Sequence, residues 1–210
     1  MAWLISGLSK KEQRELLQDL NYLNTGEIKK FCERHRIPYR IVVEMKDGSW
    51  RRTKDDDRKG VMLQRVRHFL RTGGVSQETR FRSKVVCFDD VPQDLASTDC
   101  LFYGRYDKSN RVVMGLLKEL TGGEFEDGAI ARILAREFWS RGEAPTFQKY
   151  AAAWLVARRE HTKPNAEWAY LSDRAGKKDV AEWKRLRVSK AKGVLKRLGR
   201  ITVRRAAKRR

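Results

Sequence analysis

The chain has 210 residues and carries 47 lysines and arginines against 27 aspartates and glutamates, a formal net charge of +20. A cationic surface attracts polyanions, so this balance predicts nucleic acid as the partner. No apolar run approaches the ~20 residues of a membrane span, and the first residues are too short and too little charged for a signal peptide. We therefore expect a protein that is neither secreted nor membrane-bound, in the cytoplasm as a bacterial or phage nucleoid-associated protein, or in the nucleus.

The three cysteines are Cys32, Cys87 and Cys100, and they form no C-x-x-C pair. Their odd number and wide spacing predict reduced, mostly buried thiols. The three histidines are also far apart, so neither residue type supplies the closely spaced ligands of a zinc site. Glycine-based phosphate-binding and nucleophile motifs are missing as well. We accordingly predict no metal, no cofactor and no catalytic residue.

The first 38 residues predict two short helices. Ser9 followed by Glu12 has the spacing of a capping box and opens the first helix. Asn24 and Glu27 repeat this spacing at the second helix, whose apolar residues recur every three or four positions. Pro38 marks its end.

A β-hairpin and a third helix are predicted next. Residues 41–45 are largely β-branched, residues 46–49 contain an Asp-Gly turn, and residues 50–53 would return as the second strand. The acidic run 55–57 can cap the next helix and favour its positive end. That helix, around residues 58–71, has its apolar residues on one side and stops at two glycines.

The segment 75–109 is less regular, with short strands expected at residues 85–88 and 100–103. From residue 110 the pattern is helical again. The expected helices cover residues 112–120, 128–141, 145–159, 166–171 and 178–198. The packed side of the last is expected to hold Trp183, Leu186, Ala191, Val194, Leu195 and Leu198.

These elements predict a mainly α-helical fold with a small β element. The expected domains are an N-terminal module with an inserted hairpin at residues 1–74, a mixed segment at 75–109, a helical domain at 110–199 and a basic tail at 200–210.

The positive charge is concentrated near the C-terminal end. Residues 177–210 hold 15 lysines and arginines against 2 acidic residues. If ~6–8 of these cations met phosphates, log affinity would fall with log salt concentration at a slope of about −5 to −7. We expect this segment to supply a large, sequence-independent part of the affinity for nucleic acid.

Two segments resemble a SAP domain, the small helix–extended loop–helix module of chromatin and DNA-repair proteins. The first half of the pattern matches at Leu23, Thr25, Glu27, Ile28, Lys29, Phe31, Ile37 and Pro38. The second half matches at Arg58, Lys59, Met62, Leu63, Arg65, Val66 and Leu70. The resemblance covers residues 20–73. This chain departs from the family by inserting residues 39–57 between the halves, and by Asp57 at a position where the family usually has glycine.

The resemblance implies binding to duplex DNA with weak sequence preference, through the connector and the helix starts. Lys and Arg side chains and the amides of helix starts suit phosphate oxygens independently of it. The predicted DNA contacts are Thr25, Lys29, Lys30, Arg58, Lys59 and Arg65 in the module, Arg40, Arg51 and Arg52 in the hairpin, and Lys184, Arg185, Lys192, Lys196, Arg197, Arg204 and Arg205 in the basic C-terminal helix and tail. An ordinary helical hairpin with a solvated basic face is the alternative interpretation.

Glu44 and Lys46 carry a different hypothesis. A Glu-x-Lys triplet after an apolar strand has the local pattern of half a metal-dependent nuclease site, which also needs an upstream carboxylate such as Asp19. Surface ion pairs are the simpler interpretation of such a short match. For His35 and His68 we predict structural roles beside a helical core.

Residues 128–141 and 145–159 have the spacing of a helix-turn-helix. The polar residues that could face a groove are Thr146, Gln148, Lys149 and Arg158. The aromatic stripe of the second helix instead indicates packing within a helical bundle.

We predict a non-catalytic DNA-binding protein with an accessory or architectural role. It would attach through the N-terminal basic platform and through the basic C-terminal helix and tail, which together raise avidity. Three alternatives stay open: an RNA-binding or ribonucleoprotein-associated protein, a metal-dependent nuclease, and a DNA-targeted subunit that binds a protein through residues 110–175.

Overall fold

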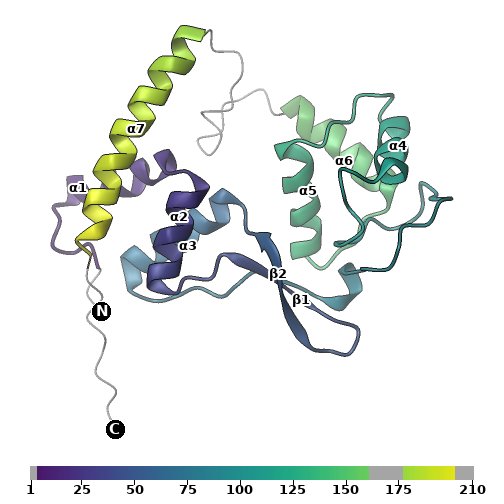
Figure 1. Ribbon diagram of the computed structural model, residues 1–210, viewed down its shortest axis with the longest axis horizontal. Helices are drawn as coiled ribbons and strands as arrows, with labels where there is room; N and C mark the ends of the chain where they lie inside the picture. Colours follow the sequence, from purple (N-terminus) through teal and green to yellow (C-terminus); the bar gives the residue numbers. More distant parts are fainter. Residues whose placement is uncertain (1–3, 161–176, 202–210) are drawn as a thin grey trace. The chain divides into compact units, whose positions relative to one another are not determined.

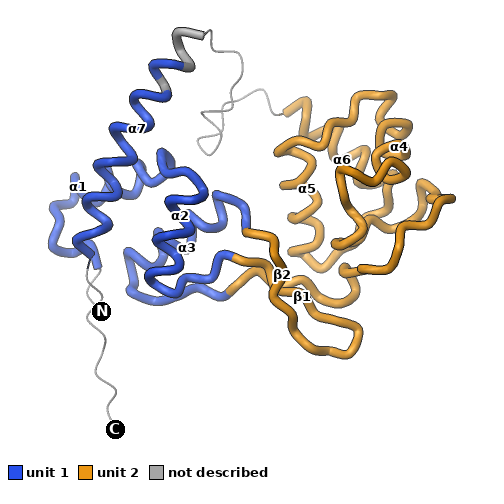
Figure 2. The backbone as a smooth tube through the Cα atoms, viewed as in Figure 1, with its two compact units in different colours: residues 1–39, 57–77, 164–210 blue, residues 40–56, 78–163 orange. Residues whose placement is uncertain are grey.

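The computed structural model of the protein describes residues 4–160 and 177–201 (Figure 1). In these residues the chain forms seven α-helices, two 3₁₀ helices and one three-stranded sheet, so the predicted mainly helical fold with a small β element is confirmed. The chain divides into two compact units (Figure 2). Unit 1 comprises residues 1–39, 57–77 and 164–210, and unit 2 comprises residues 40–56 and 78–163.

Unit 1 contains the helices α1 (Lys10–Asp19), α2 (Thr25–His35), α3 (Lys59–Thr72) and α7 (Lys177–Gly199), with the 3₁₀ helix η1 (Leu20–Tyr22) after α1. Both predicted capping boxes are present. Ser9 caps α1 by accepting from the amide of Glu12, and Asn24 caps α2 by accepting from the amide of Glu27. Each glutamate accepts in turn from the amide of its capping residue, which satisfies two donors at each helix start.

The connector between α2 and α3 is closed at its base within unit 1. The amide of Asp57 donates to the carbonyl of Tyr39 at 2.7 Å. Arg65 of α3 pairs with the carboxylate of Asp57 at 2.6 Å and donates to the carbonyl of Pro38 at 2.9 Å. The prediction that the acidic run caps α3 is wrong, since Arg58 is the N-cap residue and no side chain caps the helix. Asp57 instead holds together the two ends of a long insertion.

All four α-helices in the described part of unit 1 contribute to its core. The buried apolar residues of α7 are Ala191, Val194 and Leu198, as their spacing predicted. Leu186 and Leu195 of the same helix are 45% and 39% exposed, so their predicted packing is wrong. Among the described side chains of α7, the buried apolar stripe is therefore narrower than the sequence indicated, and the predicted packing of Trp183 lies outside them.

Unit 2 begins with the predicted β-hairpin. Strands β1 (Arg40–Glu44) and β2 (Trp50–Asp56) pair antiparallel, and the two-residue strand β3 (Arg80–Phe81) pairs parallel to β1, so the order is β2-β1-β3. Strand β3 was not predicted. The strands expected at residues 85–88 and 100–103 are instead a 3₁₀ helix, η2 (Ser83–Val85), and isolated bridges.

Three helices complete the described part of unit 2: α4 (Arg111–Leu120), α5 (Ala129–Ser140) and α6 (Phe147–Glu160). Their bounds lie close to the predicted ones. Tyr150 and Trp154 of α6 are buried, and the Tyr150 hydroxyl donates to the carbonyl of Ala131 at 2.7 Å. The Trp139 indole donates to the carbonyl of Leu101 at 2.9 Å. The aromatic stripe of α6 is thus a packing surface, as predicted.

The two units are interleaved along the chain, which differs from the expected domains. The hairpin belongs to unit 2 and not to the N-terminal module, because Ile41 and Val43 join the core that contains the α4–α6 helices. Helix α7 belongs to unit 1, because its apolar residues join the α1–α3 core. The helix predicted at residues 166–171, His161 and most of the basic tail lie outside the described residues.

Candidate nucleic-acid interface

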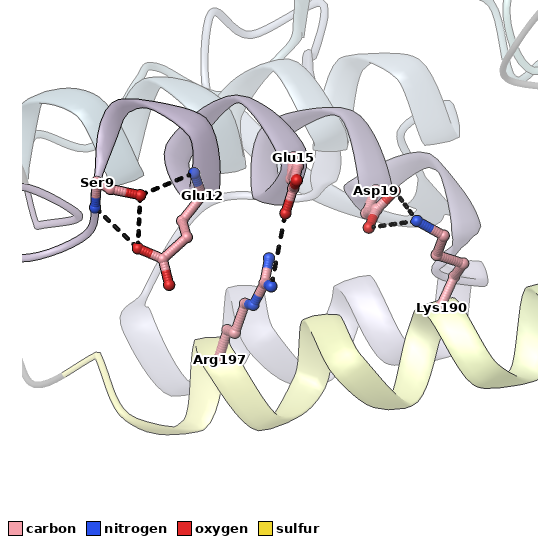
Figure 3. Close-up of polar contacts among 6 residues, drawn as sticks. All are labelled: Ser9, Glu12, Glu15, Asp19, Lys190 and Arg197. Carbon is pink, nitrogen blue, oxygen red and sulfur yellow. Dashed lines mark hydrogen bonds and ion pairs between the residues drawn. The ribbon is translucent and has the colours of Figure 1, made fainter.

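One side of α7 is held against the other helices of unit 1 by ion pairs as well as by apolar contacts. Lys190 pairs with Asp19 at 3.2 Å, and Arg197 lies 3.8 Å from the carboxylate of Glu15 (Figure 3). Arg187 pairs with Glu27 at the start of α2 and donates to the carbonyl of Tyr22. These three cations therefore position the helix.

The opposite side of α7 presents a separate row of cations. Arg185, Ser189, Lys192 and Lys196 are exposed and follow one another at spacings of four, three and four. At about 100° per residue, this row lies on the face opposite the buried residues of α7. Arg185, Lys192 and Lys196 pair with none of the described carboxylates. We call these three cations the outer α7 row; it runs over about 16 Å of helix.

The start of α2 offers less to a phosphate than the family resemblance implies. Thr25 and Lys30 are exposed, and the ammonium group of Lys29 lies 5.8 Å from the centre of the Tyr39 ring. However, the carboxylate of Glu27 already accepts from the amide of Asn24 and pairs with Arg187. A negative group thus stands at the helix end where an anion would bind.

The basic residues at the start of α3 make contacts within unit 1. Arg58 and Lys59 are half-buried, and the Lys59 ammonium group donates to the carbonyl of Asn21 at 2.6 Å. Arg67, two turns further along α3, donates to the side chain of Asn21 at 2.9 Å. Lys59 and Arg67 thus fasten α3 to the segment between α1 and α2.

Arg65 does not lie on the surface, which corrects its predicted role. Its side chain is 7% exposed and that of Asp57 is 4% exposed, so the guanidinium group meets its carboxylate inside the protein. A phosphate would have to displace this carboxylate in a desolvated site. Arg65, although it matches the family pattern, therefore has a structural role.

The three hairpin arginines belong to unit 2. Arg51 and Arg52 of β2 are exposed and point to opposite faces of the sheet, because successive strand residues alternate. Arg40 is also exposed and lies opposite Asp56 in the strand register. Arg204 and Arg205 lie outside the described residues.

In the candidate helix-turn-helix, two of the polar residues are paired. Lys149 pairs with Glu143, and Arg158 pairs with Glu124 at 3.0 Å while lying over the Trp154 ring. The Thr146 hydroxyl accepts from the amide of Lys149. Gln148 is exposed. These contacts stabilise the ends of α6 and its packing in unit 2.

Glu44 and Lys46 are each engaged in ion pairs. Glu44 accepts from the amide of Ser83 at 3.0 Å and pairs with Arg82. The Ser83 amide is the main cause that holds the pKa of Glu44 below its ordinary value. Lys46 pairs with Asp89 at 3.0 Å. Asp19, the upstream carboxylate considered for a nuclease site, belongs to unit 1, whereas Glu44 and Lys46 belong to unit 2. Among the described residues no group of three His, Cys, Asp or Glu side chains could hold a metal ion.

His35 packs between aromatic rings of unit 1. Its ring centre lies 4.3 Å from that of Phe31 and 5.1 Å from that of Phe69. Burial, and secondarily the charge of Arg34, lowers the pKa of His35. These contacts agree with the structural role predicted for His35, whereas His68 is exposed on α3 and does not pack in the core as predicted. Cys32 is buried nearby, and burial raises the pKa of its thiol to about 12.

A cavity of about 440 Å³ lies in unit 2. Tyr103 and Tyr106 line it, and their hydroxyls donate to Asp55 at 2.7 Å and to Asp127 at 2.8 Å. Its charged residues are the cations Lys108, Arg132 and Arg136 and the carboxylates of Asp55, Asp107 and Asp127. Since positive and negative groups balance, the cavity has no special attraction for a polyanion.

Comparisons with protein-family models, with characterised proteins and with solved structures find no significant match to this chain. The resemblance to the SAP domain therefore stays a prediction. No helix in the described residues has the length and apolar character needed to span a bilayer.

Sequence reasoning missed one surface, on the outward face of the sheet in unit 2. Trp50 lies there beside Arg80 and Arg82. The signal was the alternation Arg80-Phe81-Arg82, which has the period of a strand with a buried centre and two basic neighbours. A two-residue strand is too short for that alternation to predict without the partner strands.

Proposed function

We propose that the protein binds duplex DNA without catalysis and with weak sequence preference, chiefly through the outer α7 row. The observation that carries this proposal is the division of the α7 cations into two sets. The inner set pairs with Glu15, Asp19 and Glu27, whereas the outer set pairs with no described carboxylate.

The division suits a phosphate-binding role for a physical reason. A docked helix keeps its outer cations on a rigid element, so less side-chain and backbone freedom is lost on binding. Each phosphate that a cation neutralises releases condensed counterions, which makes such binding favourable at low salt and independent of sequence. An accessory or architectural role follows from contacts of this kind, which read the backbone rather than the bases.

The test is a salt titration of duplex affinity. In the triple variant Arg185→Gln, Lys192→Gln and Lys196→Gln, we expect weaker binding to a 20-base-pair duplex. The slope of log affinity against log salt should shrink by about 2.7, the value for three lost phosphate contacts. Fluorescence anisotropy at four salt concentrations measures both quantities.

The matched control removes three exposed cations of unit 2, at Lys108, Arg111 and Lys118. It changes the net charge equally but leaves the outer α7 row intact, so it should keep most of the slope. Equal losses in the two triple variants would reduce the effect to net charge and overturn the proposal. If RNA of the same length competes better than the duplex, the RNA-binding alternative replaces it.

A further inference from the structure

In the sheet of unit 2, strands β1 and β3 turn one face to the core. Ile41, Val43 and Phe81 point into the core and are fully buried. Since strand residues alternate, their neighbours point outward, and the register places Arg52 and Arg80 on either side of Val42. Val42 is 6% exposed. Two arginines therefore flank an apolar centre on the outward face.

Trp50 lies on the same outward face, opposite Glu44 in the strand register. The guanidinium carbons of Arg80 and Arg82 lie 5.0 Å and 5.3 Å from the centre of its ring. Trp50 remains 37% exposed, although burial of a side chain as large and apolar as tryptophan is favourable. The contacts with arginine hold an indole ring at the surface, beside two planar cations.

On this face the positive charges are more exposed than the negative ones. The side chains of Arg80 and Arg82 are 54% and 64% exposed, whereas their carboxylate partners Glu78 and Glu44 are only 24% and 20% exposed. Solvent therefore meets mainly guanidinium groups. Each guanidinium carries five donors, and a single carboxylate oxygen of its partner occupies at most two of them. Donors therefore remain for a further acceptor on side chains that are more than half exposed.

We propose that the Trp50 face, defined by Trp50, Arg52, Arg80 and Arg82, binds unpaired nucleotides of a single-stranded nucleic acid. A base would stack on the indole ring, and its phosphates would pair with the exposed guanidinium groups. A duplex offers the phosphates, but its base faces are stacked on one another. This site lies in unit 2 and is independent of the outer α7 row.

The test compares a 12-nucleotide oligothymidylate with an abasic strand of the same length, which keeps the phosphates and lacks the bases. Both are titrated by anisotropy against the Arg185→Gln, Lys192→Gln, Lys196→Gln protein, so that the α7 row contributes little. Adding Trp50→Ala should weaken oligothymidylate binding by about 5- to 150-fold, as expected for one lost stacking contact. The abasic strand should bind equally to both proteins.

Trp50→Phe keeps an aromatic ring and should restore most of the affinity. The matched control is Phe88→Ala, which removes a 52% exposed aromatic side chain of unit 2 that lies outside the sheet. The proposal is overturned if Trp50→Ala binds oligothymidylate as its parent does, or if it loses the abasic strand equally. Displacement of oligothymidylate by polyglutamate at equal charge would also overturn it, because negative charge without a stacked base would then be enough for binding to this face.

Discussion

At the scale of single residues, the pair formed by Arg65 and Asp57 has the clearest energetic role. Both side chains are almost completely buried, and Arg65 also satisfies the carbonyl of Pro38. The pair joins the two ends of the inserted hairpin to α3. Removing one partner of a buried pair leaves a charge that neither water nor protein compensates.

Asp57→Ala should therefore lower the free energy of unfolding by about 3 to 5 kcal/mol. The double variant Asp57→Ala, Arg65→Met removes both charges and should regain most of that loss. Urea unfolding followed by circular dichroism measures both effects. If the double variant is no more stable than the single one, the ion pair is not the origin of the loss.

The same double variant tests the corrected role of Arg65. Because this guanidinium is buried, its removal should leave the salt dependence of duplex binding unchanged at temperatures where the variant is folded. A slope that shrinks by about one would return Arg65 to the DNA-binding residues.

At the scale of elements, the two sides of α7 have different roles. Its inner side contributes Ala191, Val194 and Leu198 to the core of unit 1, and its outer side carries the proposed phosphate contacts. Leu195 lies on the same helix one turn before Leu198 but is 39% exposed, against 2% for Leu198. The two leucines therefore form a matched pair for testing the docked position.

Leu198→Ala should destabilise the protein by about 2 to 5 kcal/mol, because it removes a buried side chain and leaves a cavity. Leu195→Ala should cost less than about 0.5 kcal/mol, as is usual for a surface substitution. Chemical denaturation gives both values. Similar losses at the two positions would mean that α7 is not docked along this face.

At the scale of the whole molecule, the chain passes between the units after residues 39, 56, 77 and 163. A boundary near residue 74 or 109, as expected from the order of predicted elements, therefore cuts through both units. Fragment 1–74 contains α1, α2 and α3 but lacks α7, and it contains the hairpin without β3. Neither core is complete in that fragment.

We expect fragment 1–74 to lack a cooperative thermal transition. In the full chain, burial of Val194 and of Leu198 each contributes roughly 1.5 to 3 kcal/mol to the free energy of unfolding, which is a large share of the stability of a small domain. The fragment lacks both contributions. Adding a peptide of residues 177–201 should restore the transition, and the same peptide carrying Val194→Asp should not. A fragment that melts cooperatively without the peptide would show that α7 is dispensable to the unit 1 core.

Local sequence patterns determined most helices, the hairpin and both capping boxes, because spacings of two, three and four residues act within one element. The same patterns identified the cations of α7 and the packed stripe of α6. They could not assign each element to a core, since Val194 is buried in a core whose other helices lie more than a hundred residues away, and Ile41 joins a core that extends to Trp154. They also could not separate Arg65, which is buried, from Lys192, which is exposed. Only tertiary packing decides which of two equally charged side chains finds a carboxylate inside the fold and which stays in water.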